Sequence, residues 1–478
     1  MLLRELLPTV KGCFEDLEIT DITCDSRKVG PGFAFVCING FNMDGHKYAI
    51  DAEKSGAAVI ICEKATGAEN EVIVPDTHAA YAVMSANYFG NPANKLKLVG
   101  VTGTNGKTSV TYMLKSIIES KGYKTGVIGT IQNLIGDKII ESTNTTPDAY
   151  ALNRLFKEML DAGCEYVIME ASSHALDQKR IYSLNFEVAA FTNLTQDHLD
   201  YHLTMDNYFC AKKKLFEMCK TAVINIDDPY GKDLANQLSC NVCTYAAVDR
   251  GATFSANGIN MKPDGIEYEM VGDYTIRRIK LKTGGNFSVY NSLCAAVCAR
   301  QLGFSYDEIS EALAAMPGVK GRAEVIDTGR PFTVIIDYAH TPDGLENILK
   351  TFKELKKGRL VCLFGCGGDR DATKRPIMGS IAAKYSDFVI VTSDNPRSED
   401  PKKIIDDIVV GINKNKTPYV IIENRIEAIK FAIHKAQKDD IIILAGKGHE
   451  NYQILKTGKI HLDEREIIAE ALSTEYQG

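Results

Sequence analysis

The chain has 478 residues, of which 45% are hydrophobic and 24% are charged, so it is long enough for roughly two to four globular domains and is not disordered or fibrous. Its net charge of -7 gives no general attraction to nucleic acid or anionic lipid. No apolar run reaches the length of a membrane span, and thirteen scattered cysteines favour reduced thiols. We therefore expect a cytoplasmic protein that neither binds nucleic acid nor inserts into a membrane.

The first predicted unit is a small α/β domain over residues 1–94. Short apolar runs at 33–38 and 57–63 are typical of strands, and turn-forming residues separate them. The pattern breaks at 90–93, where Gly, Asn, Pro and Ala follow one another, and a new buried strand begins directly afterwards. We place a domain boundary at this break.

Residues 95–320 are predicted to form a second domain with a parallel sheet. Apolar runs alternate there with helical segments, which is the order expected of strands joined by crossover helices. The stretch 252–289 differs, because it is richer in alternating β-type residues and turns. We expect this stretch to form an antiparallel extension.

The strongest single signal is a phosphate loop, GTNGKTS at 103–109, between an apolar strand and a helical segment. In that setting backbone N–H groups cradle phosphates, Lys107 neutralises the β and γ oxygens, and the Thr108 hydroxyl reaches Mg²⁺. Val101 stands where a strict Walker A pattern has its first glycine. The loop predicts ATP or GTP binding, but taken alone it suits a kinase or a switch GTPase equally well.

Polar residues follow two more predicted strands of this domain. Glu170 ends the run YVIME, at the edge where a parallel sheet presents its ligands, and suits a Mg²⁺ ligand. His198 lies in NLTQDHLDYH, where acidic oxygens and a neutral imidazole are suited to a site that holds phosphate and water. Lys212, Lys213 and Lys214 form a charge run in YFCAKKKLF, and spacing alone does not favour one of the three.

A third α/β series starts after residue 320. Six segments of the chain, three before this point and three after it, resemble the Mur ligase family. They occur in the family order and are GTNGKTS at 103–109, EASSHAL at 170–176, NLTQDHLDYH at 193–202, GRAE at 321–324, DYAHTPD at 337–343 and AGKGHE at 445–450. The resemblance implies an α/β protein of three domains. These are a UDP-MurNAc-binding N-terminal domain (1–94), a central P-loop parallel-sheet ATPase domain (95–320) and a C-terminal Rossmann-like domain (321–478) that receives an amino acid.

The resemblance also implies ATP and Mg²⁺ as cofactors. It assigns catalytic roles to Lys107, Lys212 and His198, and Lys212 matches the family lysine that is carbamylated to a carboxylate surrogate. The implied metal ligands are Thr108, Glu170, His198 and Lys212. The implied ATP-binding residues are Gly103, Thr104, Asn105, Gly106, Lys107, Thr108, Ser109, Asn291, Arg322, Asp337 and His340.

Within the family, the match is closest to the branch that adds meso-diaminopimelate to the D-glutamyl γ-carboxylate of UDP-MurNAc-L-Ala-D-Glu through an acyl phosphate, in peptidoglycan synthesis. The implied contacts with the UDP-sugar-dipeptide are Ser26, Asn144, Thr145, Thr146, Ser172, Gln178 and Arg180. The implied contacts with diaminopimelate are Arg370, Asp394, Asn395, Pro396, Arg397, Gly446 and Glu450.

The choice of amino acid depends on Arg397. Diaminopimelate differs from lysine by one extra carboxylate, which a bidentate guanidinium recognises, while Glu450 suits the distal ammonium. Three alternatives remain: a lysine-adding relative, a ligase similar to folylpolyglutamate synthetase, and a P-loop nucleotide switch without catalysis. We expect a monomer whose C-terminal domain closes over the site about a hinge at GRAE.

Overall fold

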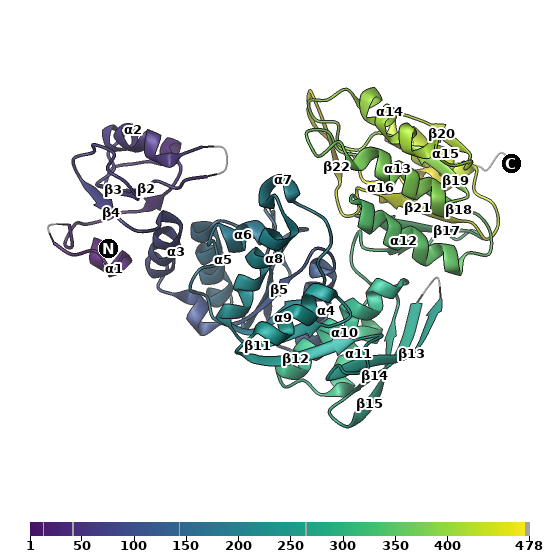
Figure 1. The fold of residues 1–478 in the computed structure, drawn as a ribbon, viewed down its shortest axis with the longest axis horizontal. Coiled ribbons are helices and arrows are strands. Elements are labelled where there is room, and N and C mark those ends of the chain that lie inside the picture. Colours follow the sequence, from purple (N-terminus) through teal and green to yellow (C-terminus); the bar gives the residue numbers. More distant parts are fainter. Residues whose placement is uncertain (13, 41–42, 143, 263–264, 474–478) are drawn as a thin grey trace.

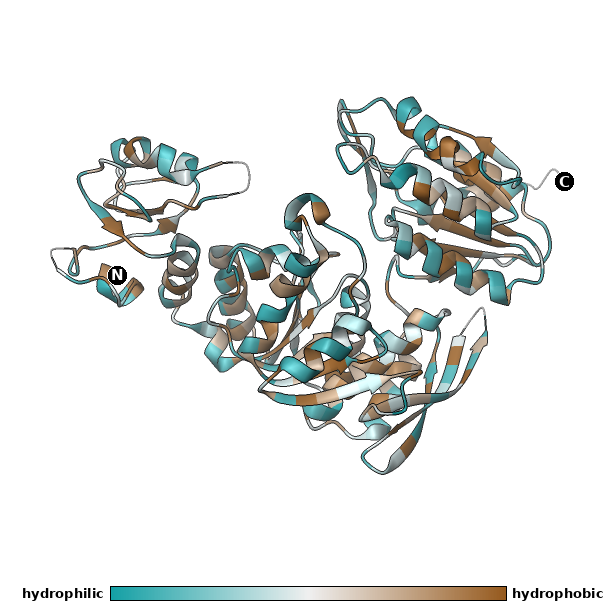
Figure 2. Cartoon of the chain, viewed as in Figure 1, coloured by the Kyte–Doolittle hydropathy of each residue, from teal (hydrophilic) through white to brown (hydrophobic). Residues whose placement is uncertain are grey.

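The computed structural model describes residues 1–12, 14–40, 43–142, 144–262 and 265–473, which form three α/β bodies in chain order (Figure 1). Each body has its own sheet, and each sheet lies inside one of the three predicted ranges. Figure 2 shows that hydrophobic residues gather along the strands, whereas the outer faces of the helices are mostly hydrophilic. This is the pattern expected of sheets covered by amphipathic helices.

The N-terminal body contains a four-stranded parallel sheet whose strands follow one another in chain order. Two apolar cores cover its two faces. The longest helix of the body packs against the central body. The elements are β1 (Ile22–Thr23), β2 (Ala34–Val36), β3 (Val59–Cys62), β4 (Glu71–Ile73), α1 (Leu3–Leu6), α2 (Ala49–Lys54) and α3 (Thr77–Tyr88).

The central body is built on an eleven-stranded sheet with the order β15-β14-β13-β12-β11-β10-β5-β9-β6-β7-β8. Its six middle strands are parallel and mostly buried, as expected of a sheet with helices on both faces. They are β12 (Asn241–Ala246), β11 (Cys219–Asn225), β10 (Phe186–Phe191), β5 (Lys97–Thr102), β9 (Tyr166–Glu170) and β6 (Thr125–Ile128), and β7 (Asn133–Ile135) and β8 (Lys138–Ile140) complete one edge.

Helices cover both faces of this central sheet. One face carries α4 (Lys107–Glu119), α10 (Asn286–Gln301) and α11 (Tyr306–Ala315). The opposite face carries α5 (Ala149–Asp161), α6 (Ser173–Asp177), α8 (Met205–Lys213) and α9 (Pro229–Gln237). The short helix α7 (Leu199–His202) lies directly before α8 in the chain.

The predicted antiparallel extension is present, but its predicted end is wrong. β13 (Phe254–Lys262), β14 (Gly265–Gly272) and β15 (Thr275–Leu281) pair antiparallel with one another. The last residues of the predicted stretch instead begin α10, which is buried on nearly all sides. A helix buried all round has no amphipathic period in its sequence, so nothing in the pattern separated it from a buried strand.

The C-terminal body has a six-stranded sheet with the order β16-β17-β21-β18-β19-β20, parallel except for β16. The strands are β16 (Glu324–Ile326), β17 (Thr333–Asp337), β18 (Leu360–Phe364), β19 (Phe388–Val391), β20 (Tyr419–Ile421) and β21 (Ile441–Ala445). One face carries α12 (Pro342–Leu355), α13 (Lys374–Tyr385) and α14 (Pro401–Ile412), and the other carries α15 (Arg425–His434) and α16 (Glu464–Ser473). Neither β16 nor the hairpin β22 (Tyr452–Leu455) and β23 (Gly458–His461) was predicted.

Helix α12 illustrates how local sequence positions a site residue. The Thr341 hydroxyl caps the helix by accepting from Gly344 N, and Pro342 occupies the first turn. The buried stripe of Leu345, Ile348, Leu349 and Phe352 fixes its rotation on the sheet. The first turn is thereby aimed at the central body.

Two further features bear on the expectations from composition. Among the described residues, no helix combines the length and the apolar character needed to cross a membrane. The cysteines of the described ranges are free thiols, and Cys13 lies outside those ranges.

Candidate active site

A cleft of about 820 Å³ lies between the central and C-terminal bodies. It is lined by the phosphate loop and the ends of β9 and β10 from the central body, and by the segment 337–354 from the C-terminal body. Asp343 on α12 accepts hydrogen bonds from Asn105 Nδ2 (2.8 Å) and Thr195 Oγ1 (3.2 Å) across it. The predicted ATP site is therefore shared by two bodies.

The phosphate loop turns sharply between β5 and α4. Gly106 has φ 87°, and a Cβ at that position would lie 2.4 Å from Asn291 Oδ1, so only glycine fits. Asn291 on α10, a predicted ATP-binding residue, therefore lies against the loop. The Lys107 ammonium donates to the carbonyl oxygens of Gly103 and Thr104 (both 2.9 Å), and this curls its side chain over the loop.

Hard oxygen donors meet beside the loop. The Thr108 hydroxyl donates to Glu170 Oε1 (3.0 Å), and Glu170 is 1% exposed. Thr130 also holds this carboxylate, through its N–H to Oε1 (2.9 Å) and its hydroxyl to Oε2 (3.0 Å). A hydroxyl and a carboxylate next to a phosphate-binding loop fit Mg²⁺, which takes few protein ligands and completes its shell with phosphate and water. No cluster of three or more His, Cys, Asp or Glu suited to a metal occurs in the described ranges.

Burial separates Lys212 from the two lysines that follow it. Its side chain is buried, its Nζ donates to Gly103 O (2.8 Å), and it lies 4.4 Å from the centre of the Tyr208 ring. Burial, with the charge of Lys107 next in importance, holds the pKa of Lys212 well below its usual value. By contrast, Lys213 bonds Gln237 and Lys214 pairs with Asp177 near the surface. A neutral amine at this position is the form that reacts with carbon dioxide.

His198 lies beside Lys107 and Lys212 in the cleft. Its ring centre is 4.9 Å from that of His174. Desolvation lowers the pKa of His198, while the neighbouring Asp197 carboxylate opposes this shift. The imidazole is therefore neutral at neutral pH and able to accept a proton or a ligand.

The predicted UDP-sugar-dipeptide residues form a connected group next to Glu170. The Thr146 hydroxyl donates to the Glu170 carbonyl (2.7 Å) and lies 3.2 Å from Ser172 Oγ, and the Thr145 hydroxyl lies 3.0 Å from Thr130 Oγ1. Arg180 donates to Thr146 O (2.8 Å) and to Gln178 Oε1, which fixes its guanidinium.

Two predicted members of this group lie at its margin. The Asn144 carbonyl accepts from Ser142 Oγ (3.0 Å). Ser26 begins a 3-10 turn of the N-terminal body, Ser26–Lys28. The predicted substrate contacts therefore come from two bodies.

Three predicted ATP-binding residues of the C-terminal body also line the cleft. Arg322 donates to Thr108 Oγ1 (3.2 Å) and stacks 4.7 Å from the centre of the Tyr338 ring. The Asp337 carboxylate accepts from Ala323 N and Ala339 N, and burial raises its pKa. A ring nitrogen of His340 lies 2.8 Å from Tyr338 O, and His340 lines the cleft.

The predicted diaminopimelate residues follow three neighbouring strands, β21, β18 and β19, at their carboxyl ends. Asn395 Nδ2 donates to Glu450 Oε2 (3.0 Å), which joins two of the loops. Arg397 Nη1 donates to Gly368 O (2.7 Å), and Gly367 lies against both Arg397 and Arg370. The remaining predicted members of the group are Asp394, Pro396 and Gly446.

This acceptor group lies beside the cleft and does not line it within the described part of the chain. Gly448 contacts Tyr338, and Tyr338 lines the cleft, so Tyr338 connects the two regions.

Thr130, Tyr338 and Lys447 were missed as site residues. Thr130 follows β6, and its contact with Glu170 depends on β6 lying next to β9, which is not evident from chain order. Lys447 stands within the AGKGHE segment, but its burial is visible only in the folded chain. The sequence signal for Thr130 and Lys447 was that each of them follows an apolar run.

Comparison with known proteins covers all three bodies. Residues 18–93 match the model for the Mur ligase family, catalytic domain, residues 101–299 the Mur ligase middle domain, and residues 321–448 the Mur ligase, glutamate ligase domain. A protein of Clostridium botulinum named UDP-N-acetylmuramoyl-L-alanyl-D-glutamate--2,6-diaminopimelate ligase is 48% identical over 95% of both chains. A protein of the same name from Caldanaerobacter subterraneus is 48% identical over 99% of this chain and 98% of its own.

Solved structures agree with this relationship. A structure of UDP-N-acetylmuramoyl-L-alanyl-D-glutamate--2,6-diaminopimelate ligase has a TM-score of 0.72 and 32% identity, and the match covers 99% of this chain and 98% of the other. MurF ligase from Thermotoga maritima, solved in complex with ADP, shares the fold with a TM-score of 0.62 at 18% identity over 95% of this chain and 97% of the other. Three family models together match most of the chain, and the relatives match nearly its whole length, so the chain belongs to the Mur ligase family.

Proposed function

We propose that the protein is an ATP-dependent ligase that joins meso-diaminopimelate to the D-glutamyl γ-carboxylate of UDP-MurNAc-L-Ala-D-Glu in peptidoglycan synthesis. The observation that carries the proposal is that relatives 43 to 48% identical over nearly the whole chain bear the name of this ligase. The phosphate loop in the cleft and the predicted amino-acid-binding group beside the cleft support the same reaction.

The reaction divides into two displacements. A carboxylate oxygen of the D-glutamyl group attacks the γ-phosphorus of ATP, and ADP leaves to give an acyl phosphate. The diaminopimelate amine then attacks the carbonyl carbon, the bond to the phosphate oxygen breaks, and phosphate leaves as the nitrogen loses a proton. No side chain serves as a nucleophile, so catalysis depends on positioning and on charge neutralisation.

The residues of the cleft are suited to these tasks. Lys107 neutralises the phosphate oxygens, and Arg322 lies within reach of the same region through Thr108. Mg²⁺, which would supply further neutralisation of phosphate charge, would be held by Thr108, Glu170 and a carbamylated Lys212, with His198 beside them. The low pKa of Lys212 supports carbamylation, because a neutral amine is required to take up carbon dioxide.

The acceptor group favours diaminopimelate over lysine. Arg397 and Arg370 offer guanidinium groups to the extra carboxylate, and Glu450 offers a carboxylate to the distal ammonium. A lysine acceptor would leave the guanidinium groups without an anionic partner.

The test is an acceptor competition with purified protein, ATP, Mg²⁺ and the UDP-muramyl dipeptide, in which ADP release and product are followed with diaminopimelate, lysine or glutamate. We expect ADP release to require an acceptor and diaminopimelate to be preferred. Preference for lysine or for glutamate would contradict the assignment. Nucleotide binding without acceptor-dependent ADP release would identify a nucleotide switch instead.

A further inference from the structure

We propose that Lys447 is a positioning residue for acceptor recognition, which holds Asn395 and Glu450 in the arrangement that receives the distal ammonium of the amino acid. The inference rests on the proposed function. Lys447 was not among the predicted site residues.

The contacts of Lys447 show that it acts inside the protein. Its side chain is 0% exposed, and its ammonium donates to Asn395 Oδ1 (2.6 Å), Glu450 Oε2 (2.9 Å) and Tyr452 O (2.6 Å). An ammonium has three N–H donors, so these bonds use all of them. Lys447 is therefore a fixed link between the loops that follow β19 and β21, and it has no donor left for a substrate.

The link determines how Asn395 presents its amide. Asn395 Oδ1 accepts from Lys447 Nζ and from Ile454 N (2.9 Å), while its Nδ2 donates to Glu450 Oε2. The reversed amide would point its NH₂ group at the ammonium and at another N–H donor. The cation thus fixes the amide orientation.

Glu450 is fixed by the same link. Its Oε2 accepts from both Lys447 and Asn395, and its side chain is 11% exposed. Because two donors already hold Oε2, we assign the binding of the incoming ammonium to Oε1. A carboxylate held in this way loses little side-chain entropy when it binds the acceptor.

The charges near Lys447 point to the same role. Asp394 Oδ1 lies 3.9 Å from the ammonium, so the carboxylates of Asp394 and Glu450 both lie around this cation. The neighbouring Arg425 and Glu464 form a fully buried pair that neutralises itself. Without Lys447, two like charges would remain in a buried region, and one carboxylate would move or take up a proton.

The experiment compares meso-diaminopimelate with 2-aminopimelate, which lacks the distal amine, as acceptors for the wild-type protein and for Lys447→Met. We expect at least a tenfold higher KM for diaminopimelate in the variant, KM values for ATP and the UDP-muramyl dipeptide within about twofold of wild type, and roughly tenfold less discrimination between the two acceptors. If Lys447 acts through Glu450, adding Lys447→Met to Glu450→Gln should change the discrimination little further.

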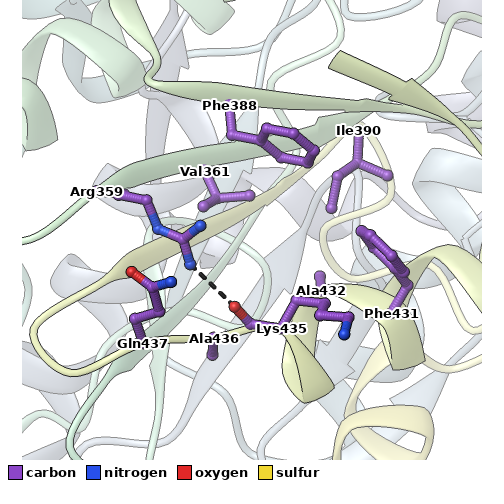
Figure 3. Close-up of a pocket in the computed structure, with 9 residues that line it drawn as sticks. All are labelled: Arg359, Val361, Phe388, Ile390, Phe431, Ala432, Lys435, Ala436 and Gln437. Atoms are coloured by element: carbon purple, nitrogen blue, oxygen red, sulfur yellow. Dashed lines mark hydrogen bonds between the residues drawn. The ribbon is translucent and has the colours of Figure 1, made fainter. Parts of the chain in front are cut away.

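A matched control breaks another ion pair of the same body, between Arg359 and the buried Asp440 (2.6 Å). This pair lies where β18 and β21 begin, whereas Lys447 follows the end of β21. A cavity of about 220 Å³ lies beside the pair, and Arg359 also donates to the Lys435 carbonyl there (Figure 3). Arg359→Met should lower stability and leave the acceptor discrimination unchanged. The discrimination between diaminopimelate and 2-aminopimelate therefore distinguishes a positioning role of Lys447 from a general loss of stability.

Discrimination that stays at the wild-type value in Lys447→Met, or KM values that rise equally for all three substrates, would overturn the inference. If Lys447→Met does not fold, Lys447→Gln, which keeps two N–H donors without the charge, provides the same ratio. Failure of the wild-type protein to use diaminopimelate would refute the proposed function itself. A selective wild type with an equally selective variant would refute only the role of Lys447.

Discussion

Lys212 and Lys447 are two lysines whose side chains are almost completely buried, and both lie in the group of charges around the proposed reaction. An ammonium is expensive to bury without partners, so a buried lysine either loses its charge or gains a full set of acceptors. Lys212 has one carbonyl partner and a lowered pKa, whereas Lys447 has three acceptors. The two solutions correspond to two proposed roles, a reactive amine and a fixed cation.

His449 provides a pH-dependent prediction at the same scale. Burial, aided by the charges of Arg322 and Arg465, lowers its pKa to about 3, and its Nδ1 is buried without a partner among the described residues. The histidine pKa in the unfolded chain is about 6.5. As the pH falls below this value, the unfolded chain therefore binds a proton at His449 that the folded chain does not bind. Stability is lost on acidification, by about 2 kcal/mol at pH 5.

His449→Gln should remove this loss, as measured by urea unfolding at pH 7.5 and pH 5. His461 is the control, because its bond to Glu466 (2.7 Å) raises its pKa and His461→Gln should change the pH dependence in the opposite direction. Equal pH dependence in wild type and His449→Gln would contradict the assignment.

At the scale of elements, the site is made where strands end. The phosphate loop follows β5, Glu170 ends β9, Thr130 follows β6, and the acceptor group follows β18, β19 and β21. Parallel strands present their carboxyl ends at one edge of a sheet, which brings these segments together. In the C-terminal body, Asp337 at the end of β17 lines the cleft, and the acceptor group lies beside it.

Gly321, in the turn before β16, tests how closely these loops are fitted. It has φ 69°, and a Cβ there would lie 2.2 Å from His449 N and 2.3 Å from Gly448 C. Gly321→Ala should therefore lower stability by on the order of 3 kcal/mol and raise the KM for the acceptor, because the loop that carries Glu450 must move.

Gly329 is a matched control for this substitution. It has a similar φ of 59°, and nothing lies within 4 Å of its added Cβ. Gly329→Ala should cost only the backbone strain, about 1 kcal/mol, without an effect on KM. Thermal unfolding and acceptor titration of the two variants would distinguish the effect of the close contact at residue 321 from that of the backbone strain alone. Two variants with the same stability and the same KM would contradict the prediction.

At the scale of the whole molecule, the predicted site residues come from three bodies. The predicted UDP-sugar-dipeptide residues lie on the N-terminal and central bodies, the phosphate loop on the central body, and the predicted acceptor group on the C-terminal body. Closure about the GRAE segment remains a prediction, and it would bring the acceptor group toward the acyl phosphate and exclude water.

The bonds of Asp343 to Asn105 and Thr195 hold the C-terminal body against the central one. Asp343→Ala should enlarge the radius of gyration of the ligand-free protein, measured by X-ray scattering, and ATP analogue with both substrates should restore a compact form. Asp327, whose carboxylate accepts from Gly329 N in an exposed turn, gives the control variant. Scattering profiles that are identical for wild type and Asp343→Ala would show that these bonds do not hold the bodies together.

Most of the alternation of strands and helices and the phosphate loop were determined by the sequence itself, because a buried strand, a glycine turn and a following helix leave local patterns in apolar spacing and turn residues. The family was indicated by the resemblance of six sequence segments. Strand order across a sheet leaves no such pattern. The support of Glu170 by Thr130, the choice of Lys212 over Lys213 and Lys214, and the burial of Lys447 were decided only by tertiary structure, since each depends on which distant segments become neighbours and on how much water they exclude.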